Sequence, residues 1–359
     1  MNRPPKFDIV VLGGGPAGLM AALSAAKNGR TALVTNRLPD LDGPFRIDVV
    51  PAQTLALLAE SGIDPRTLGA ESLSRGQGVC WETETPRWSD NARTAHIERP
   101  VLECALFKAL RMDNRAAIII DRARPHFDGG VFKGEHWQAK ILIDATGRAA
   151  VTARQRIRLH PAWAGRFYWT TRSAAPKVTP EFRMIALPSG YAYRLGTARH
   201  IGIGLVGRGE CLHANPALTL RGASFLCEGM PALASMMQGA TSISSVQWSI
   251  AGHALLAGDA AIARDAISSQ GLAASLSDSL YAVAAVLSER RDCLHLRQDK
   301  NLTAHLKLLK EQIARCRYRE KPLWQAYDRF INEQMVNIAE CRGAPAISQG
   351  RIETLSLSA

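Results

Sequence analysis

FDIVVLGGGPAG, residues 7–18, joins a short apolar run to a glycine-rich turn. A run with several β-branched residues is typical of a buried parallel strand. The following stretch, LMAALSAAKNG (19–29), places Leu19, Met20, Leu23 and Ala26 on one helical face and ends at a glycine. RTALVTNR (30–37) reads as a second strand. The first 37 residues therefore predict one strand–turn–helix–strand unit.

The glycines of this turn have separate roles. Gly13 permits the tight turn, Gly15 lets the backbone approach a pyrophosphate, and Gly18 lets the helix pack closely on the strand. The helix begins at Pro16, which has no amide hydrogen, and the backbone amides from Ala17 onward, with a partial positive charge, face the phosphates. Because a strand, a helix and a second strand surround the motif in the required order, it predicts a dinucleotide-binding site.

The end of the second strand departs from this pattern. An acidic residue usually holds a ribose hydroxyl there. This chain has Thr35 or Asn36 at that position, and a neutral side chain binds a hydroxyl more weakly. Arg37, which follows, is expected to lie against the adenine or a phosphate.

Two later segments resemble nucleotide-binding corners. In LIDATGR (142–148) a buried strand carrying Asp144 ends in a small turn at Gly147, where backbone can pass close to a nucleotide. LLAGDAAIARDAISSQGL (255–272) repeats the arrangement with Gly258 and with Asp259, which can bind a ribityl chain. The second segment then starts a helix whose first amides would face a flavin ring, at Gln270, Gly271 and Leu272.

Together, GGGPAG, LIDATGR and AGDA…SSQG resemble the three flavin fingerprints of the flavin-dependent aromatic hydroxylase, halogenase and prenyl-reductase group. The resemblance covers most of residues 7–285 and implies non-covalently bound FAD. ERPVLECAL (98–106) resembles that group's arginine-containing segment, which implies that Arg99 lies close to the cofactor. RIDVVPAQTLALLAESGI (46–63) resembles the segment beside the isoalloxazine. The group usually has Asp-Pro in its third fingerprint, whereas this chain has Asp265-Ala266, which bears on the rigidity of that loop.

The predicted fold class is α/β. It comprises a two-dinucleotide-binding, Rossmann-like FAD domain, an inserted and mainly antiparallel β substrate domain, and a C-terminal helical segment. The predicted FAD domain is discontinuous, over residues 1–70, 96–160 and 248–290. The substrate domain takes residues 71–95 and 161–247, where aromatic residues and turns dominate. Residues 291–359 form the helical segment.

Four aromatic residues are candidates for lining a substrate cavity: Trp169, Tyr191, Tyr193 and Trp248. Each is also explained as ordinary core. Four histidines would titrate near neutral pH, namely His96, His160, His200 and His253. Nothing in the sequence selects one of them, so no catalytic residue is assigned.

The resemblance also bears on the reaction. RCRYREKPLWQAYDRF (315–330) resembles the tail of flavoproteins that mature tryptophylquinone cofactors, which implies hydroxylation of a tryptophan in a partner polypeptide. The same stretch predicts a packed helix with Trp324, Tyr327 and Phe330 in the core. Related halogenases use a lysine in the segment where the chain first leaves the FAD domain for the substrate domain, here called the first excursion (residues 70–95). This chain has none between Lys27 and Lys108, which disfavours halogenation.

The favoured function is therefore an FAD-dependent monooxygenase acting on an aromatic substrate. NAD(P)H is expected as reductant. Because no second G-x-G-x-x-G is present, it would bind transiently, or another reductant would serve. One alternative is an FAD-dependent reductase or oxidase of a prenyl or polyketide-like small molecule. Another is a flavin-bound maturation chaperone without turnover.

Composition narrows the partners. The net charge of +12 over 359 residues favours an anionic ligand. Aromatic residues are not interleaved with the basic ones, so no nucleic-acid partner is expected. Seven cysteines without a C-x-x-C pair predict neither a disulfide framework nor a metal site. No apolar run is long enough for a transmembrane segment. Only Met1–Asp8 precede the first strand-like run, so a cytoplasmic location is expected.

Overall fold

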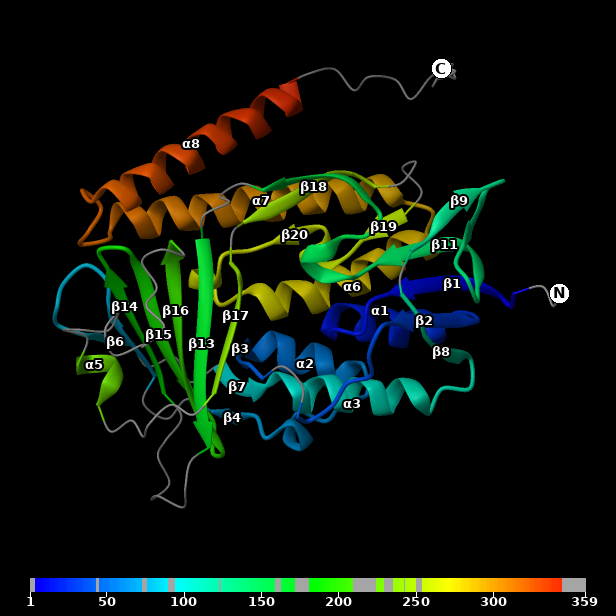
Figure 1. Ribbon diagram of the computed structural model, residues 1–359, viewed down its shortest axis with the longest axis horizontal. Coiled ribbons are helices and arrows are strands. Elements are labelled where there is room, and N and C mark those ends of the chain that lie inside the picture. The colour runs from blue at the N-terminus through cyan, green and yellow to red at the C-terminus, as the bar shows by residue number, and fades with distance from the viewer. Residues whose placement is uncertain are drawn as a thin grey trace.

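The predicted α/β fold class is confirmed by the computed structural model of the chain (Figure 1). The structure describes residues 4–42, 45–72, 76–89, 94–122, 124–158, 163–171, 181–208, 224–228, 235–241, 243–249 and 254–343. Two large sheets lie side by side, and helices cover them. In the described part of the chain, no helix is both long and apolar enough to cross a membrane.

The first sheet contains the N-terminal strand and has the order β8-β2-β1-β11-β10-β9, with β19 also paired to β11. Its strands are β1 (Lys6–Leu12), β2 (Thr31–Thr35), β8 (Ala116–Ile120), β9 (His126–Asp128), β10 (Val131–Lys133), β11 (Gln138–Asp144) and β19 (Ala254–Leu256). Strands β8, β2, β1, β11 and β19 are parallel. Their carboxyl ends therefore meet at one edge, where ligands of α/β sheets bind.

Helices pack beside this sheet and bury its apolar side chains. They are α1 (Pro16–Ala26), α2 (Ala52–Glu60), α3 (Arg99–Arg111) and α6 (Gly271–Leu287), with the short turns η1 (Pro65–Leu68), η2 (Gly147–Ala149), η5 (Gly258–Ala260) and η6 (Ala266–Ser268). The predicted single apolar face of α1 is too narrow, because every residue of this helix except Ser24 is buried. Small residues such as Ala21, Ala22 and Ala25 let neighbouring elements approach α1 from all sides.

The second sheet has the order β17-β13-β16-β15-β14-β5-β6. Its strands are β5 (Gln77–Cys80), β6 (Arg87–Ser89), β13 (Trp163–Thr171), β14 (Phe182–Leu187), β15 (Gly190–Gly196), β16 (His200–Arg208) and β17 (Ser235–Ala240). All neighbouring pairs are antiparallel except β5 and β14, which run parallel. The predicted antiparallel character is thus correct for most of the sheet. The exception arises because an early segment joins a strand about a hundred residues later.

Two small sheets complete the strands. One, β3-β7-β4, contains β3 (Ile47–Pro51), β4 (Glu71–Ser72) and β7 (Thr94–Glu98). The other, β12-β18-β20, contains β12 (Ala153–Arg158), β18 (Ser244–Ser249) and β20 (Ile262–Ala263). The short helix α5 (Ser224–Cys227) packs on β14. The predicted domain boundaries remain a prediction, although residues 77–89 do join the second sheet.

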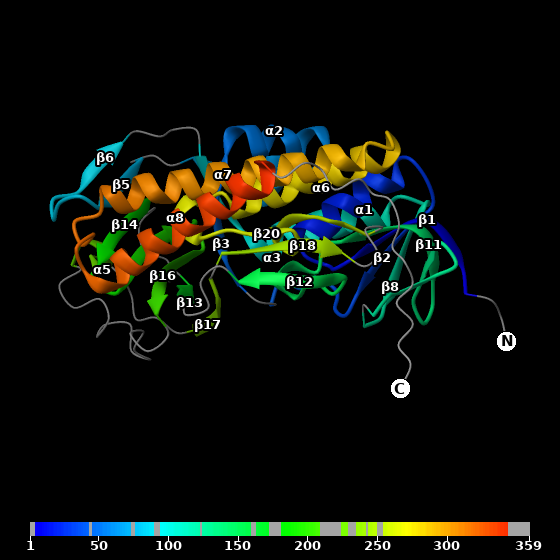
Figure 2. The same cartoon turned by 90° about the horizontal axis from the view of Figure 1, so that it is seen from above.

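The C-terminal segment forms two long helices, α7 (Arg291–Ala314) and α8 (Pro322–Gly343). They pack on each other along one side of the molecule, as Figures 1 and 2 both show. Trp324 and Tyr327 are fully buried and Phe330 packs against the same cluster, as predicted. The Trp324 indole donates to the Leu187 carbonyl at the end of β14 over 2.9 Å. The helices therefore belong to the core of the second sheet.

Candidate functional site

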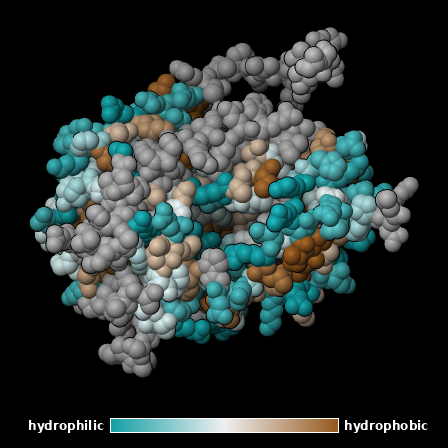
Figure 3. Space-filling view, in the orientation of Figure 1, coloured by the Kyte–Doolittle hydropathy of each residue, from teal (hydrophilic) through white to brown (hydrophobic). Residues whose placement is uncertain are grey.

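A cavity of about 660 Å³ lies between the two large sheets. The space-filling view shows a hollow near the middle of the face seen in Figure 1 (Figure 3). Residues following β1, β2, β11 and β19 line one part of it, and strands β13, β14, β15, β16 and β17 line the other. The carboxyl edge of the parallel sheet thus opens directly onto the second sheet.

The first glycine corner is shaped by close backbone packing. Gly13 has φ +107, and a Cβ there would overlap the carbonyl oxygen of Ala145. A Cβ on Gly18 would overlap the carbonyl of Gly13, so Gly18 serves helix–strand packing and does not line the cavity. A Cβ on Gly15 would meet no protein atom within 4 Å, and Gly15 lines the cavity. Gly13 and Gly18 therefore build the corner, while Gly15 leaves room for a ligand.

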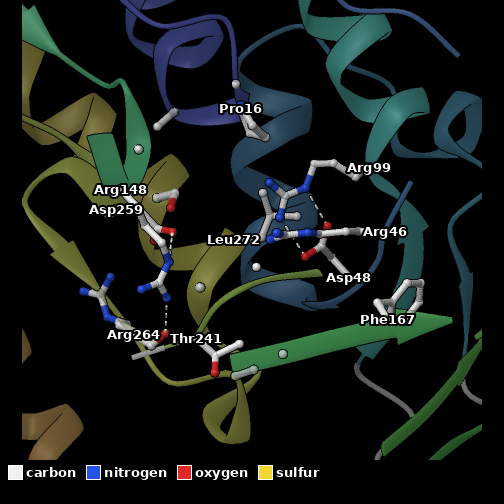
Figure 4. A pocket seen from close by; sticks show the side chains of 18 of the residues that line it. Pro16, Arg46, Asp48, Arg99, Arg148, Phe167, Thr241, Asp259, Arg264 and Leu272 are labelled. Atoms are coloured by element: carbon white, nitrogen blue, oxygen red, sulfur yellow. Dashed lines mark hydrogen bonds and ion pairs between the residues drawn. The ribbon is translucent and has the colours of Figure 1, made fainter. Parts of the chain in front are cut away.

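The N-terminus of α1 faces this room. Pro16 and Ala17 line the cavity, and Figure 4 shows Pro16 at its upper edge. No side chain of the described residues caps this end, and the first turn holds no acidic residue. Its amides and its positive dipole end are thus available to an anion.

The end of β2 places its three candidates differently. Thr35 is 2% exposed and its hydroxyl donates to the Arg37 carbonyl over 2.8 Å. That hydroxyl therefore shapes the turn, although Thr35 also borders the cavity. Asn36 and Arg37 are exposed and line the cavity. Their side chains are the ones free to meet an adenosine.

Arg99, at the start of α3, lies in the cavity wall. Its guanidinium holds Asp48 with two bonds, Nε to Oδ2 at 2.7 Å and Nη2 to Oδ1 at 2.8 Å (Figure 4). Burial opposes the charge, but the pairing with Asp48 raises the pKa of Arg99 above its ordinary value. Burial raises the pKa of the neighbouring Glu103 carboxyl, which also lines the cavity. Asp48 lies in the segment predicted to flank the isoalloxazine, but its bidentate pairing was not foreseen.

At the second corner, Gly147 lines the cavity and Asp144 does not. Gly147 has φ +64 and lines the cavity. Asp144 is fully buried behind it and does not line the cavity. Its carboxylate accepts bonds of 2.6–2.9 Å from the amides and hydroxyls of Thr146 and Thr152. Asp144 thus fixes the turn that presents Gly147.

At the third corner too, some of the predicted residues line the cavity and others do not. Asp259 and its partner Arg148 line the cavity with Oδ2 and Nε 3.9 Å apart (Figure 4). Gly258 has φ +60 and packs against Ala17 of α1, so it closes the corner from behind. Gly271 and Leu272, the first residues of α6, line the cavity.

Gln270 faces a different space. It lines a second cavity of about 470 Å³, which lies against the β5–β6 hairpin and α7. Four residues line both cavities: Val49, Phe182, Met184 and Ser269. The two spaces therefore share a wall.

Of the three aromatic candidates whose side chains the structure describes, only Tyr193 lines the first cavity. Tyr191 is buried behind it, and its hydroxyl donates to Asp265 over 2.5 Å. Trp169 stacks between Phe45 and Phe167, at ring distances of 5.5 and 6.1 Å. The side chain of Trp248 lies outside the described residues.

Sequence reasoning missed most of the apolar wall, which contains Phe167, Phe182, Met184, Leu195, Leu205, Val206 and Met237. Every residue of β14 is buried, so alternation could not show which face meets the cavity. The charged lining was also missed in part. Among the described lining residues, seven arginines stand against four acids: Arg37, Arg46, Arg99, Arg122, Arg148, Arg166 and Arg264 against Asp48, Glu103, Asp259 and Asp265. The excess of positive charge suits an anionic ligand.

Neither of the two described histidine candidates, His96 and His200, lines the cavity. His96 is buried, its Nδ1 lies 2.6 Å from the Gly196 carbonyl, and burial lowers its pKa to about 4. His200 Nδ1 lies 2.9 Å from Glu98. His160 and His253 fall outside the described residues. Within the described ranges, no cluster of three His, Cys, Asp or Glu side chains could hold a metal.

A family model and a curated relative each match part of the chain. Residues 6–142 match a family model described as an FAD binding domain. The digeranylgeranylglycerophospholipid reductase of Methanocaldococcus jannaschii is 25% identical over 153 residues, which are 39% of this chain and 38% of that enzyme. The match thus spans well under half of the curated relative.

Solved structures extend the likeness to the whole fold. A peptidyl tryptophan dihydroxylase essential for tryptophylquinone cofactor biogenesis has a TM-score of 0.71 and 19% identity, over 89% of this chain and 78% of its own. A flavin-dependent halogenase from Brevundimonas sp. BAL3 has a TM-score of 0.70 and 12% identity, over 93% and 84%. The chain therefore has the fold of the FAD-dependent hydroxylase and halogenase flavoproteins.

Proposed function

We propose that this protein is an FAD-dependent monooxygenase that hydroxylates an aromatic ring. The observation that carries the proposal is the first cavity, in which the uncapped N-terminus of α1 and an apolar wall face each other. When bound and reduced, FAD supplies the electrons with which molecular oxygen is activated. The cavity residues then have two tasks: to hold the cofactor and to hold a ring beside it.

The cofactor's pyrophosphate would lie over Gly15 and the open N-terminus of α1. A Cβ at Gly15 would occupy this space, and no acidic residue of the described first turn opposes a phosphate there. Asn36 and Arg37 would meet the adenosine. Asp259 would bind the ribityl hydroxyls, with Arg148 holding its carboxylate in place. The residues present therefore fit a dinucleotide.

The flavin ring would lie between Arg99 and the start of α6. The Arg99–Asp48 pair is nearly neutral as a unit, so it offers hydrogen bonds without a large net field. Gly271, the first residue of α6, lines the cavity, so the positive end of the α6 dipole faces it. This end would favour negative charge on a reduced flavin.

The apolar wall would hold the substrate. Phe182 and Met184 of β14 and Tyr193 of β15 face the cavity from the second sheet. Such a surface favours an aromatic ring and excludes water, which protects activated oxygen from unproductive breakdown. Burial raises the pKa of Tyr193 to about 12, so its hydroxyl stays protonated and can donate a hydrogen bond at neutral pH.

The substrate ring would belong to a partner polypeptide, with tryptophan as the first choice. The second cavity supports this step, because it shares Phe182 and Met184 with the first and reaches Trp88, which is 43% exposed. A side chain still attached to a peptide could enter there while the peptide stays outside. The similarity to a peptidyl tryptophan dihydroxylase supports the same choice.

The decisive experiment follows oxygen. The purified protein is loaded with FAD, reduced with NADPH or dithionite, and mixed with oxygen and a tryptophan-containing peptide. We expect the peptide to gain one oxygen atom from labelled O₂, seen by mass spectrometry. A folded protein that refuses FAD, or flavin reoxidation that never oxygenates an aromatic substrate, would refute the proposal. Comparing reduction by NADPH with reduction by dithionite also tests whether NAD(P)H serves as the reductant.

A matched pair of variants tests the substrate wall. Met184→Glu places a charge where both cavities meet, so we expect product formation to fall at least about tenfold while FAD stays bound. Met236→Glu is the control, because that residue of β17, in the same sheet, is 48% exposed and lines neither cavity. Equal activity of the two variants would place the substrate elsewhere.

We also propose that this protein does not halogenate its substrate, because the lysine that related halogenases use has no counterpart between Lys27 and Lys108. Gln77, Val79 and Trp81 from the first excursion line the second cavity, and no lysine is among its described lining residues. We therefore expect bromide or chloride to leave the product unchanged. A halogenated peptide would overturn this part of the proposal.

A reductase is the second candidate, favoured by the match to a digeranylgeranylglycerophospholipid reductase. Its substrate would be a prenyl or polyketide-like molecule in the same apolar space. Anaerobic conditions separate the two, because a reductase would consume reduced flavin without oxygen. A non-catalytic maturation chaperone would show neither reaction.

A further inference from the structure

The loop between β20 and α6 contains a buried carboxylate, Asp265, which is 2% exposed. Asp265 caps η6 by accepting from the Ile267 amide over 2.9 Å. The loop lines the first cavity with Arg264, Asp265, Ala266 and Ser269, and α6 follows directly. The position of this loop therefore determines where α6 meets the cavity.

Two tyrosines from distant parts of the chain bind the same carboxylate. Tyr191 of β15 donates to Oδ1 over 2.5 Å, and Tyr327 of α8 donates to Oδ2 over 2.7 Å. Both tyrosines are at most 1% exposed. Burial raises the pKa of Asp265 and these hydrogen bonds oppose that rise. Hydrogen bonds to a buried carboxylate are among the stronger ones in proteins.

A third bond comes from α7. The Asp265 amide donates to His305 Nε2 over 3.1 Å, so this nitrogen acts as an acceptor and carries no proton. Burial lowers the pKa of His305 to about 3, which keeps the ring neutral. Asp265 is therefore held by the second sheet and by both C-terminal helices.

The backbone explains why such anchoring is useful. Asp265 has φ −69 and ψ 140, the conformation that a residue adopts before proline. Ala266 is the first residue of η6, where a proline ring is tolerated. A proline would restrict this loop covalently, whereas alanine leaves the unfolded chain more freedom. The chain thus has a proline-compatible turn without the proline.

We propose that Tyr191, Tyr327 and His305 replace that covalent restriction, and that they are positioning residues for the cofactor end of α6. They act through Asp265, and no residue of α7 or α8 is among the described residues lining the first cavity. The inference rests on the proposed place of FAD at α6. Its physical content, a loop fixed from the far side by C-terminal helices, can be measured without FAD.

Hydrogen–deuterium exchange of residues 262–272 tests the inference on the FAD-free and FAD-loaded full chain. Tyr327→Phe and Tyr191→Phe each remove one donor, so we expect the loop amides to exchange about tenfold faster. Adding Ala266→Pro to each variant should restore slow exchange. Tyr281→Phe is the control, because that tyrosine is on α6 but 47% exposed. FAD affinity and the visible circular dichroism of bound FAD should follow the same order.

The outcomes separate cleanly. Faster loop exchange that Ala266→Pro reverses supports positioning, because a proline at η6 could not repair lost packing around α8. Unchanged loop exchange in folded Tyr327→Phe and Tyr191→Phe would overturn the inference, as would faster exchange that proline leaves unchanged. If the wild-type protein does not bind FAD, but exchange in the FAD-free loop is still faster in the tyrosine variants and slowed again by Ala266→Pro, the proposed function fails and the loop anchoring stands.

Discussion

The corner of the first sheet and the wall of the second sheet face the same cavity but are built in different ways. The corner is mainly backbone: Gly13 in a left-handed turn, Gly15 beside open space, and helix N-termini. The wall is made of side chains from β13 to β17, closed from behind by Trp324 and Tyr327 of α8. Most of the corner is built within residues 13–18, with Ala145 as the distant residue packed on Gly13, whereas the whole wall needs residues that are far apart in the chain. A substitution in the corner should therefore have a local effect, whereas a substitution in the wall should destabilise the whole fold.

The largest expected effect concerns the wall. Trp324→Ala removes a fully buried side chain and its bond to the Leu187 carbonyl, so we expect a loss of about 4 kcal/mol in the free energy of unfolding. Urea denaturation measures it. Val336→Ala, on the same helix but 54% exposed, is the control and should change little. A loss no greater than the control's would mean that α8 does not belong to the core.

The next effect lies where the small β3-β7-β4 sheet meets the sheet that carries the wall. His96 of β7 contacts the Gly196 carbonyl of β15, and burial lowers its pKa from 6.5 to about 4. Between these values the unfolded chain binds a proton that the folded chain does not. Stability should therefore fall by up to about 3 kcal/mol as the pH drops from 6.5 to 4. Urea midpoints measured across this range for the wild type and for His96→Gln check it. Equal slopes would show that His96 is not the titrating group.

The corner itself offers a pair of glycines. Gly13→Ala forces an alanine to φ +107 against the Ala145 carbonyl, so we expect a loss of about 2 kcal/mol or more in stability. Gly15→Ala meets no protein atom within 4 Å, so its stability should stay the same while FAD affinity falls. Fluorescence titration and urea denaturation separate the two effects. If Gly15→Ala binds FAD normally, the pyrophosphate lies elsewhere.

The smallest effect belongs to neither region. Asp128 pairs with Lys133 at 2.6 Å in the β9–β10 hairpin, where both side chains meet solvent. Asp128→Ala should leave the urea midpoint and FAD affinity unchanged, because exposed ion pairs contribute little. A clear shift in either would mean that this hairpin has a partner or a role outside both the corner and the wall.

The contrast between corner and wall also explains what could be predicted from the sequence. The strand–turn–helix–strand unit and the glycine corners were predictable, because turn geometry depends on neighbouring residues. Spacing identified the right loops but not the side of each loop. Asp144 therefore lies behind the cavity, and Gln270 faces the second one.

The wall was harder to predict for a physical reason. Alternation along a strand reveals a cavity face only when the other face meets solvent, and β14 is buried on both. The aromatic candidates were chosen by residue type alone, so Tyr193 lines the cavity while Tyr191 and Trp169 pack behind it. The bonds to Asp265 join residues 191, 265, 305 and 327, and no local pattern connects these positions.

The parallel pairing of β5 with β14 sets an order on folding. Strand β5 is made early, but its partner is made only about a hundred residues later. Closing so long a loop slows folding, and the early hairpin has an unpaired edge in the meantime. The sheet is then sealed by α8, near the end of the described chain. A ribosome-bound chain lacking this helix would therefore hold its glycine corners and the strands of its wall, but not Trp324 and Tyr327, which close the wall from behind.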